Sequence, residues 1–368
     1  MNNNLKSNPK EDGFSMPIET AEHERCWMIW PERTDNWRHG AKPAQKVFTK
    51  VANTIAKYET VVMLVSNKQY ENARFHLDKK VKVIEMSNND AWMRDIGPTF
   101  VRNEKTGEVR GVNWIFNSWG GINEGLYFPW DDDNNIAHKV CSLIDYEYYN
   151  APLVLEGGSI HSDGDGTVYV TAECLLNKNR NPDLTKAEIT NHLKNYLGVE
   201  KVLWIPRGVY NDETSGHVDN VIQIIEPGHV LLTWTDDQKD PQYQRSLEAY
   251  NFLTSNKDAK GRKIKVTKIH QPDPIFYKEK EVSDIDPSGG MLRKSHTRLP
   301  ASYANFYLAN NAVILPIFND KKWDDNAIKT IKEVFPKRKV EPIYAREILL
   351  GGGNIHCITQ QEPKKLKL

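Results

Sequence analysis

A cysteine in the segment GGGNIHCITQQEP is the first candidate for chemistry. Cys357 follows three glycines, and most of its neighbours in this segment are polar. Glycine lets the backbone approach other groups closely and adopt positive φ angles. We therefore expect this segment to present the thiol at the end of a strand instead of packing it inside the core. Cys26, Cys141 and Cys174 are expected to be ordinary buried cysteines.

A nucleophilic cysteine needs a group that accepts its proton and a second group that orients the acceptor. The segment SGHVDN supplies His217 and Asp219, whose side chains project on the same face if the segment is extended. Glu156 ends an apolar run before two glycines, which is an unfavourable place for a carboxylate without a partner. Asp95 follows Trp92 at the entrance of a predicted hairpin.

Three acids are more than a cysteine–histidine hydrolase requires, because one acid is enough to orient the histidine. A surplus of carboxylates predicts a cationic group in the substrate. A guanidinium is planar and donates paired N–H bonds, so two carboxylates can hold its edges while the sulfur lies over its carbon. Its positive charge would also favour ionised carboxylates and the thiolate.

These residues are far apart in the sequence, so a repeated architecture must bring them together. Asp95, Glu156 and His217 follow one another at intervals of 61 residues, and Cys357 follows His217 after 140 residues, which is close to two repeats. Each polar cluster lies between an apolar strand pattern and a hairpin signal. Five strand, hairpin and helix units of about 60 to 70 residues, packed radially around one axis, would place the clusters at the centre.

The predicted units can be stated as residue ranges. Each pairs a strand with a following hairpin segment: 81–86 with 97–116, 153–158 with 159–171, 201–206 with 216–234, 264–270 with 302–318, and 340–345 with 351–363. Residues 184–198 and 324–336 have helical spacing of their apolar residues, and residues 25–31 would complete the first unit. An ordinary mixed α+β protein in which the spacings are accidental remains the alternative.

Composition excludes several classes of protein. The 368 residues include 49 Lys and Arg and 49 Asp and Glu, so no global charge recruits nucleic acid or an anionic membrane. No apolar run approaches the roughly 20 residues of a membrane span. The first residues lack the pattern of a secretion signal, and the four scattered cysteines fit neither a disulfide framework nor a zinc ribbon. We expect a cytoplasmic protein with one domain over residues 1–368, a polar extension at 1–14 and a solvated tail at 363–368.

The chain resembles the agmatine deiminases, a family of the guanidino-group-modifying pentein superfamily. The resemblance runs nearly end to end through the motifs WMIWPER, NNDAWMRDIGPTF, FNSWGG, LYFPWD, EGGSIHSDGDGT, NDETSGHVDN and GGGNIHCITQQEP. It implies an α/β propeller of five ββαβ units with fivefold pseudo-symmetry around a central channel. It also implies hydrolysis of agmatine to N-carbamoylputrescine and ammonia in polyamine metabolism and putrescine biosynthesis, by a dimer or tetramer that needs no cofactor and no metal.

The resemblance also implies a role for each site residue. Cys357 matches the nucleophile and His217 the general acid and base, while Glu156 matches the acid that supports the histidine. Asp95 and Asp219 match the carboxylates that bind the guanidinium. The intermediate implied by these roles is a thiouronium ester of the cysteine.

Further residues are implied in the outer part of the site. Trp92 and Trp119 resemble walls of the channel, and Glu213 resembles the residue that receives the distal amine of agmatine. The nearest alternative is deimination of free or peptidyl arginine. A free arginine substrate would demand a cationic partner for its carboxylate, which Glu213 would repel, whereas Arg94 and Arg207 are expected to be structural.

Two alternatives come from other classes of protein. A metal hydrolase could use His161, His217 and His356 with the acids. A calcium loop starting at Asp163 would need Glu at its twelfth position, which is Cys174, so a turn is favoured there. The third alternative is a propeller that binds a polyamine without catalysis, although cation binding alone would not require the cysteine and the histidine.

Overall fold

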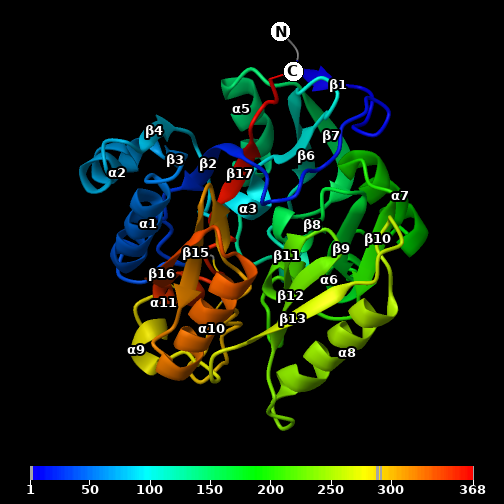
Figure 1. The fold of residues 1–368 in the computed structure, drawn as a ribbon. Coiled ribbons are helices and arrows are strands. Elements are labelled where there is room, and N and C mark those ends of the chain that lie inside the picture. The colour runs from blue at the N-terminus through cyan, green and yellow to red at the C-terminus, as the bar shows by residue number, and fades with distance from the viewer. Residues whose placement is uncertain (1–2, 287–289, 291, 368) are drawn as a thin grey trace.

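Five small sheets surround a common centre, and the long helices lie on the outside of the ring (Figure 1). The computed structural model of the chain describes residues 3–286, 290 and 292–367. In each sheet, two antiparallel strands are followed by a helix and by a strand that runs parallel to the second strand. The prediction of a propeller of five repeated α/β units is confirmed.

Four of the units follow one another along the chain. The first comprises β5 (Thr99–Arg102), β6 (Val109–Ile115), α5 (Ile136–Leu143) and β7 (Tyr148–Val154). The second comprises β8 (His161–Ser162), β9 (Thr167–Thr171), α7 (Lys186–Leu197) and β10 (Lys201–Ile205). The third comprises β11 (Ile222–Glu226), β12 (His229–Trp234), α8 (Pro241–Ser255) and β13 (Lys265–His270). The fourth comprises β14 (Tyr307–Ala309), β15 (Ala312–Ile317), α10 (Lys321–Val334) and β16 (Lys339–Tyr344).

The fifth unit joins the two ends of the chain. It comprises β17 (Gln360–Pro363), β2 (His23–Ile29), α1 (Lys42–Ile55) and β3 (Thr60–Val65), with β4 (Lys82–Glu85) added to the same sheet. Figure 1 shows β17 in red beside β2 in blue. Buried Glu362 of β17 accepts a hydrogen bond from Trp27 Nε1 of β2 at 2.9 Å, which supports this pairing, and it accepts another from Tyr146 Oη of the neighbouring unit at 3.0 Å. Residues 25–31 do share a sheet with β4, the strand of the predicted first unit, but the hairpin β5–β6 of that unit lies in the next sheet. The predicted boundaries of the units are wrong in the same way throughout, because each predicted strand completes the sheet that precedes its predicted hairpin.

Local sequence signals explain where the elements begin and end. Helix α7 starts with a capping box of Thr185 and Glu188 and ends at Gly198, which has a φ of 61°. The predicted hairpin turns lie where the signals placed them, between β5 and β6, β8 and β9, β11 and β12, and β14 and β15. The strand expected over 153–158 is wrong after Val154, because Gly157–Ser159 form a 3-10 turn that carries part of the site.

The two terminal segments differ from the expectation. Within the expected extension 1–14, β1 (Asn4–Leu5) pairs with β7 and Phe14 is buried under the guanidinium of Arg110. Residues 1–2 of that expected extension and residue 368 of the expected tail lie outside the described residues. Pro363 is a buried residue of β17, so the exposed tail starts after it. The burial of apolar side chains in both segments explains why they pack instead of extending into solvent.

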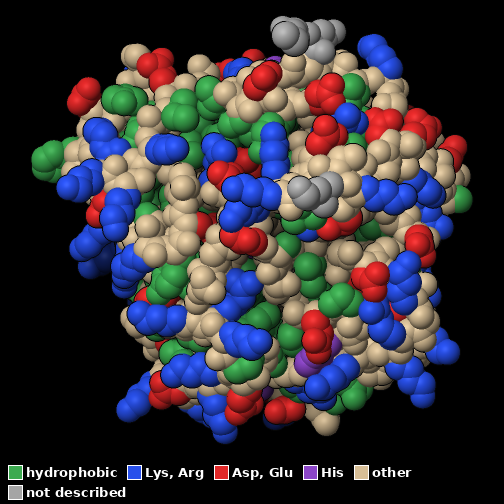
Figure 2. Space-filling view, turned by 45° about the horizontal axis from the view of Figure 1, so that its top comes forward, with side chains coloured by type: hydrophobic (Ala, Val, Ile, Leu, Met, Phe, Trp, Pro, Cys, Tyr) green, Lys and Arg blue, Asp and Glu red, His purple; other side chains and the backbone are tan. Residues whose placement is uncertain are grey.

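The surface matches the balanced composition. Figure 2 shows Lys and Arg interspersed with Asp and Glu over the face in view. Among the described residues, no helix combines the length and the apolar character that crossing a bilayer would require.

Candidate active site

The five residues of the predicted catalytic set lie together although each cluster comes from a different part of the ring. The short helix α3 (Met93–Ile96) carries Asp95, and the 3-10 turn Val218–Asn220 carries Asp219 directly after His217. Glu156 precedes the turn before β8, and Cys357 lies in the turn before β17. All five side chains are buried, with Cys357 the most exposed at 7%. Asp95, Glu156 and His217 precede the hairpins of three successive units, which explains the interval of 61 residues read in the sequence.

His217 is held between two carboxylates. Its Nε2 lies 3.3 Å from Glu156 Oε2, and its Nδ1 lies 3.8 Å from Asp95 Oδ1. Burial disfavours the imidazolium, but Asp95 and the hydrogen bond to Glu156 raise the pKa of His217 well above its ordinary value. Glu156 is also bonded by the buried guanidinium of Arg180 at 2.7 Å, which helps to lower the pKa of Glu156 against the effect of burial. The free protein therefore holds His217 as a proton donor.

Asp95 is a buried carboxylate with two donors. Its Oδ1 accepts from the backbone N–H of Gly158 at 2.9 Å, and its Oδ2 accepts from Trp119 Nε1 at 2.9 Å. Burial, together with the nearby negative charges of Asp219 and Glu156, raises the pKa of Asp95 to about 6. A bound cation would stabilise the ionised form of Asp95, because Asp95 lacks an ionic partner as close as those of Glu156 and Asp219.

The thiol of Cys357 faces Asp219 and an amide. Its Sγ lies 3.7 Å from Asp219 Oδ2, and Asn305 Nδ2 donates to the sulfur at 3.4 Å. Burial and the carboxylates of Asp219 and Asp95 raise the pKa of the thiol well above its ordinary value. The free protein therefore holds a neutral thiol, and a cation placed between these carboxylates would favour the thiolate.

Two glycines permit this close assembly. A Cβ on Gly158 would lie 2.6 Å from His217 Nδ1 and 2.8 Å from Asp95 Oδ1. A Cβ on Gly353 would lie 2.6 Å from the ring of Trp92 and 3.1 Å from the sulfur of Cys357. The glycine run before Cys357 therefore serves close packing around the thiol.

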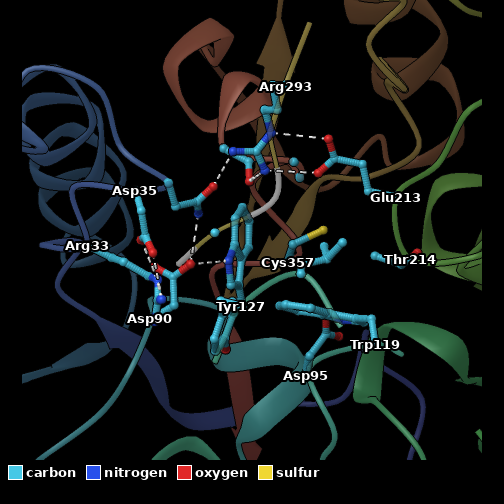
Figure 3. A pocket seen from close by; sticks show the side chains of 17 residues that line it. Arg33, Asp35, Asp90, Asp95, Trp119, Tyr127, Glu213, Thr214, Arg293 and Cys357 are labelled. Atoms are coloured by element: carbon cyan, nitrogen blue, oxygen red, sulfur yellow. Dashed lines mark hydrogen bonds and ion pairs between the residues drawn. The ribbon is translucent and has the colours of Figure 1, made fainter. Parts of the chain in front are cut away.

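A pocket leads from the surface to the thiol, and Figure 3 shows its lining. Trp92 and Trp119 both line it, and Trp92 also stacks on Trp37 with ring centroids 5.2 Å apart. Trp92 Nε1 donates to Asp90 Oδ2 at 2.8 Å. The indole of Trp92 is thus both a wall of the pocket and a part of the surrounding core.

Glu213 lines the same pocket, but it is not a free carboxylate. Arg293 binds both of its oxygens, with Nε at 3.1 Å from Oε1 and Nη2 at 2.9 Å from Oε2. Arg293 also donates to the carbonyl of Gly351 at 2.7 Å and to Asn36. Figure 3 shows this pair above Cys357. The pair neutralises Glu213 in the free protein.

Sequence reasoning missed four residues of the site, which are Glu19, Arg180, Arg293 and Asn305. Each contacts a predicted residue or its neighbour. Glu19, Arg180 and Arg293 lie outside the polar clusters that the repeat singled out. Asn305 lies in the predicted segment 302–318, just before β14, which is the place in the repeat where the other clusters lie before their hairpins. The two arginines that were expected to be structural have partners outside the catalytic set, since Arg94 binds Glu19 and Arg207 binds Glu248.

Two groups of side chains have the composition of metal ligands. One is Glu19, His161 and His356, and the other is Glu156, Cys174 and His217. In each group an arginine lies within 3.3 Å of the carboxylate, and that positive charge disfavours a second cation. The proposed set of His161, His217 and His356 is divided between the two groups. Asp163 to Gly166 form the β8–β9 turn, as the turn interpretation predicted.

The other cysteines are all buried and unpaired, as expected. Cys174 differs from the expectation in one respect, because its sulfur lies within 4.8 Å of ligand atoms of Glu156 and His217. It therefore packs against the back of the site as well as the core.

Comparison with known proteins places this fold and site in a family. A family model described as Porphyromonas-type peptidyl-arginine deiminase matches residues 15–363, and the chain belongs to this family. A protein of Mycoplasma capricolum subsp. capricolum named "Putative agmatine deiminase" is 64% identical over 363 residues, covering 99% of each chain. An agmatine deiminase of Medicago truncatula is 51% identical over 369 residues, covering 98% of this chain and 99% of that protein. The solved structure of the agmatine deiminase of Enterococcus faecalis has a TM-score of 0.95 at 46% identity, covering 98% of this chain and 99% of the other.

Proposed function

We propose that this protein is an agmatine deiminase, which hydrolyses agmatine to N-carbamoylputrescine and ammonia. One observation carries the proposal: a buried thiol, a histidine and three carboxylates lie together in a chain whose full-length relatives are named agmatine deiminases, and Cys357 and Asp95 of this group line a pocket. Agmatine is a guanidinium joined by four carbons to a primary amine. Asp95 and Asp219 are the carboxylates proposed to bind its guanidinium edges.

The first half of the reaction forms a covalent intermediate. The guanidinium charge between Asp95 and Asp219 opposes the carboxylates that hold Cys357 as a thiol, so binding itself promotes the thiolate, and the thiol proton is released to solvent. The sulfur adds to the guanidinium carbon. His217, which enters as the imidazolium, gives its proton to the nitrogen that leaves as ammonia. A thiouronium ester of Cys357 remains.

The second half releases the product. His217 is now neutral and takes a proton from water, which attacks the carbon of the thiouronium. The carbon–sulfur bond breaks, N-carbamoylputrescine leaves and the cysteine sulfur is free again. Glu156, bonded to both His217 and Arg180, stabilises each return of the imidazolium. Two steps replace a direct attack by water on a resonance-stabilised carbon.

The outer pocket favours an amine over a carboxylate. Arg293 is the cation that a free arginine substrate would need, yet its Nε and Nη2 are bonded to Glu213 and Gly351. The paired arrangement of donors that recognises a carboxylate is thus already occupied. We propose that Glu213 receives the distal ammonium of agmatine while it keeps its bond to Arg293, and that Trp92 and Trp119 flank the carbon chain.

The deciding experiment offers the purified protein agmatine and arginine in parallel. We expect ammonia and N-carbamoylputrescine from agmatine, with kcat/KM far above the value for arginine, and no product with Cys357→Ala. A clear preference for arginine would reverse the proposed role of Glu213. Activity that is lost on metal chelation and restored by added metal would contradict the thiol mechanism.

The remaining proposals concern the protein in the cell. We propose a cytoplasmic enzyme of polyamine metabolism with one domain over residues 1–368. Four buried and unpaired cysteines support a reducing compartment. The resemblance to the agmatine deiminases supports a homodimer or homotetramer, which light scattering of the purified protein tests directly.

A further inference from the structure

A row of buried charged groups lies behind Asp219, and the reaction described above does not use it. His356 Nδ1 lies 2.9 Å from Asp219 Oδ2, and His356 Nε2 lies 2.9 Å from Glu19 Oε1. Arg94 Nη1 lies 3.3 Å from Glu19, and Gln223 donates to Glu19 at 3.2 Å. Asp219, His356 and Glu19 are all at most 4% exposed. The row therefore reaches from the catalytic centre to the segment before β2.

His356 must carry two protons to make both bonds. A neutral imidazole has a single N–H, whereas each ring nitrogen of His356 faces a carboxylate oxygen. Burial opposes the charged form, and so does Arg94, but Glu19 and Asp219 together raise the pKa of His356. Both contacts are then charge-assisted hydrogen bonds, which are shorter and stronger than neutral ones.

The bond from His356 fixes Asp219 in one orientation. Its Oδ2 is occupied, whereas its Oδ1 is buried and has no hydrogen-bond partner within the part of the chain that the structure describes. His356 also lowers the pKa of Asp219, although burial acts in the opposite direction. Oδ2 also lies 3.7 Å from the sulfur of Cys357, so His356 holds an ionised carboxylate beside the nucleophile.

The same histidine is tied to the nucleophile. The backbone N–H of His356 donates to Asn305 Oδ1 at 3.1 Å, and Asn305 Nδ2 donates to the sulfur of Cys357 at 3.4 Å. A shift of His356 would therefore move both the carboxylate and the thiol that must meet the same carbon atom.

We propose that His356 and Glu19 are positioning residues, which together hold Asp219 ionised and oriented beside the sulfur of Cys357 for contact with the substrate guanidinium. Glu19 keeps His356 doubly protonated, and His356 in turn orients Asp219. The inference rests on the proposed function, because it assigns Asp219 to the guanidinium. Neither residue touches the substrate.

His161 provides a matched control within the same cluster. Its ring centroid lies 5.2 Å from that of His356, and its side chain is fully buried. Among the described residues, neither of its ring nitrogens has a hydrogen-bond partner, and burial lowers the pKa of His161 to about 4. Its Nδ1 lies 3.8 Å from Glu19 Oε1, beyond hydrogen-bond distance, so its replacement changes the packing of the cluster without removing a hydrogen bond of the row.

The experiment compares Glu19→Gln and His356→Gln with His161→Phe in the full chain. The first readout is kcat/KM for agmatine. The second is protection of Cys357 from iodoacetamide by guanidinium chloride at concentrations below those that unfold the protein. Guanidinium needs only the carboxylates and not the distal amine site, so this readout does not depend on which guanidino compound is the substrate.

We expect kcat/KM to fall on the order of 100-fold in Glu19→Gln and His356→Gln, as for a misplacement of about 1 Å in a catalytic group. The guanidinium concentration that gives half protection should rise at least about tenfold in both variants. The unprotected rate of alkylation should stay at or above the wild-type rate, whereas a merely structural defect would lower alkylation and turnover together. His161→Phe should change neither readout by more than about threefold.

Three results would overturn the inference. One is that guanidinium protects Cys357 in both Gln variants as well as it does in wild type. The second is that His161→Phe loses as much kcat/KM and protection as the Gln variants. The third is that the rate of alkylation falls together with kcat/KM in the Gln variants. Glu19→Gln keeps the size of the original side chain. This variant therefore tests the inference alone if His356→Gln fails to fold. Wild-type protein that is protected by guanidinium but does not turn over agmatine would refute the proposed function and leave the positioning inference standing.

Discussion

Replacing Asp95 with Asn separates the charge of this carboxylate from its shape. The carboxylate is proposed to bind the guanidinium, and losing one partner of a buried, hydrogen-bonded charge pair costs about 2 to 5 kcal/mol. At about 1.36 kcal/mol per tenfold change in rate, kcat/KM for agmatine should fall roughly 30- to 5,000-fold. A fall of less than about threefold would mean that Asp95 does not contact the guanidinium.

The same variant has a predictable effect on stability. The pKa of Asp95 is raised from 3.8 to about 6, so between these pH values the folded protein binds more protons than the unfolded chain. Its stability therefore falls as the pH rises through this window, by about 3 kcal/mol at about 1.36 kcal/mol per pKa unit. Below pH 3.8 the penalty is absent, and above about pH 6 it is fully present. Asp95→Asn has no such dependence.

A second effect acts in the opposite direction. Both oxygens of Asp95 accept hydrogen bonds, from Gly158 and from Trp119. An Asn side chain has one oxygen, so its amide nitrogen would face a donor, at a cost of about 1 to 3 kcal/mol. Near neutral pH the two effects nearly cancel, and the change of stability with pH is the informative quantity.

Urea unfolding at about pH 4 and about pH 7 measures that change. We expect the difference in unfolding free energy between Asp95→Asn and wild type to move by about 3 kcal/mol in favour of the variant as the pH rises. The acidic limb of kcat/KM, expected near the pKa of about 6 in wild type, should also disappear in the variant. Equal slopes of stability with pH in the two proteins would refute the reasoning.

Three further predictions concern the surroundings of the thiol. Gly158→Ala would place a Cβ within 3.0 Å of three polar atoms of the site, and we expect kcat/KM to fall at least about 100-fold while the circular dichroism spectrum stays unchanged; near-normal activity would contradict this packing. Arg180→Met leaves buried Glu156 without its cation, so urea unfolding should show that the free energy of unfolding falls by about 3 to 5 kcal/mol. The control Arg207→Met, whose ion pair is one-third exposed, should lose less than about 1 kcal/mol. Similar losses in the two variants would argue against a buried charge at Glu156. Glu213→Gln should raise KM for agmatine roughly 10- to 100-fold and leave KM for butylguanidine, which lacks the amine, unchanged; an equal change for both compounds would exclude a contact with the distal amine.

The repeat in the fold was predictable because each unit carries its own signals. The hairpin turns have characteristic residues, the outer helices have a polar and an apolar face, and the strands are apolar. The polar cluster in each unit interrupts that pattern at the same point, so Asp95, Glu156 and His217 were visible from their spacing. Burial of an acid before a glycine pair was the strongest single signal, and Glu156 is fully buried.

Three of the four residues that were missed lie outside this regular pattern, whereas Asn305 stands just before β14 in the fourth unit. Glu19 precedes the first long strand, and Arg293 lies in a long connection without periodicity. These two acquire their roles from partners far away in the sequence, Glu19 from His356 and Arg293 from Glu213. No local pattern in a single sequence specifies such pairs. The small strand β1 was missed because its two residues are too few for an alternation to appear.

The pairing of β17 with β2 has a consequence for how the protein is made. Trp27 and Glu362, which join these strands, are 335 positions apart, and Cys357 lies three positions before β17. A chain still growing on the ribosome has already completed the other polar clusters when the segment carrying the sulfur emerges. The last contacts to form are the ones of greatest sequence separation, which are slow to find. A half-made chain therefore has no complete site, and a guanidinium can meet the thiol between the carboxylates only when the closing strand has found its place beside one made at the start of synthesis.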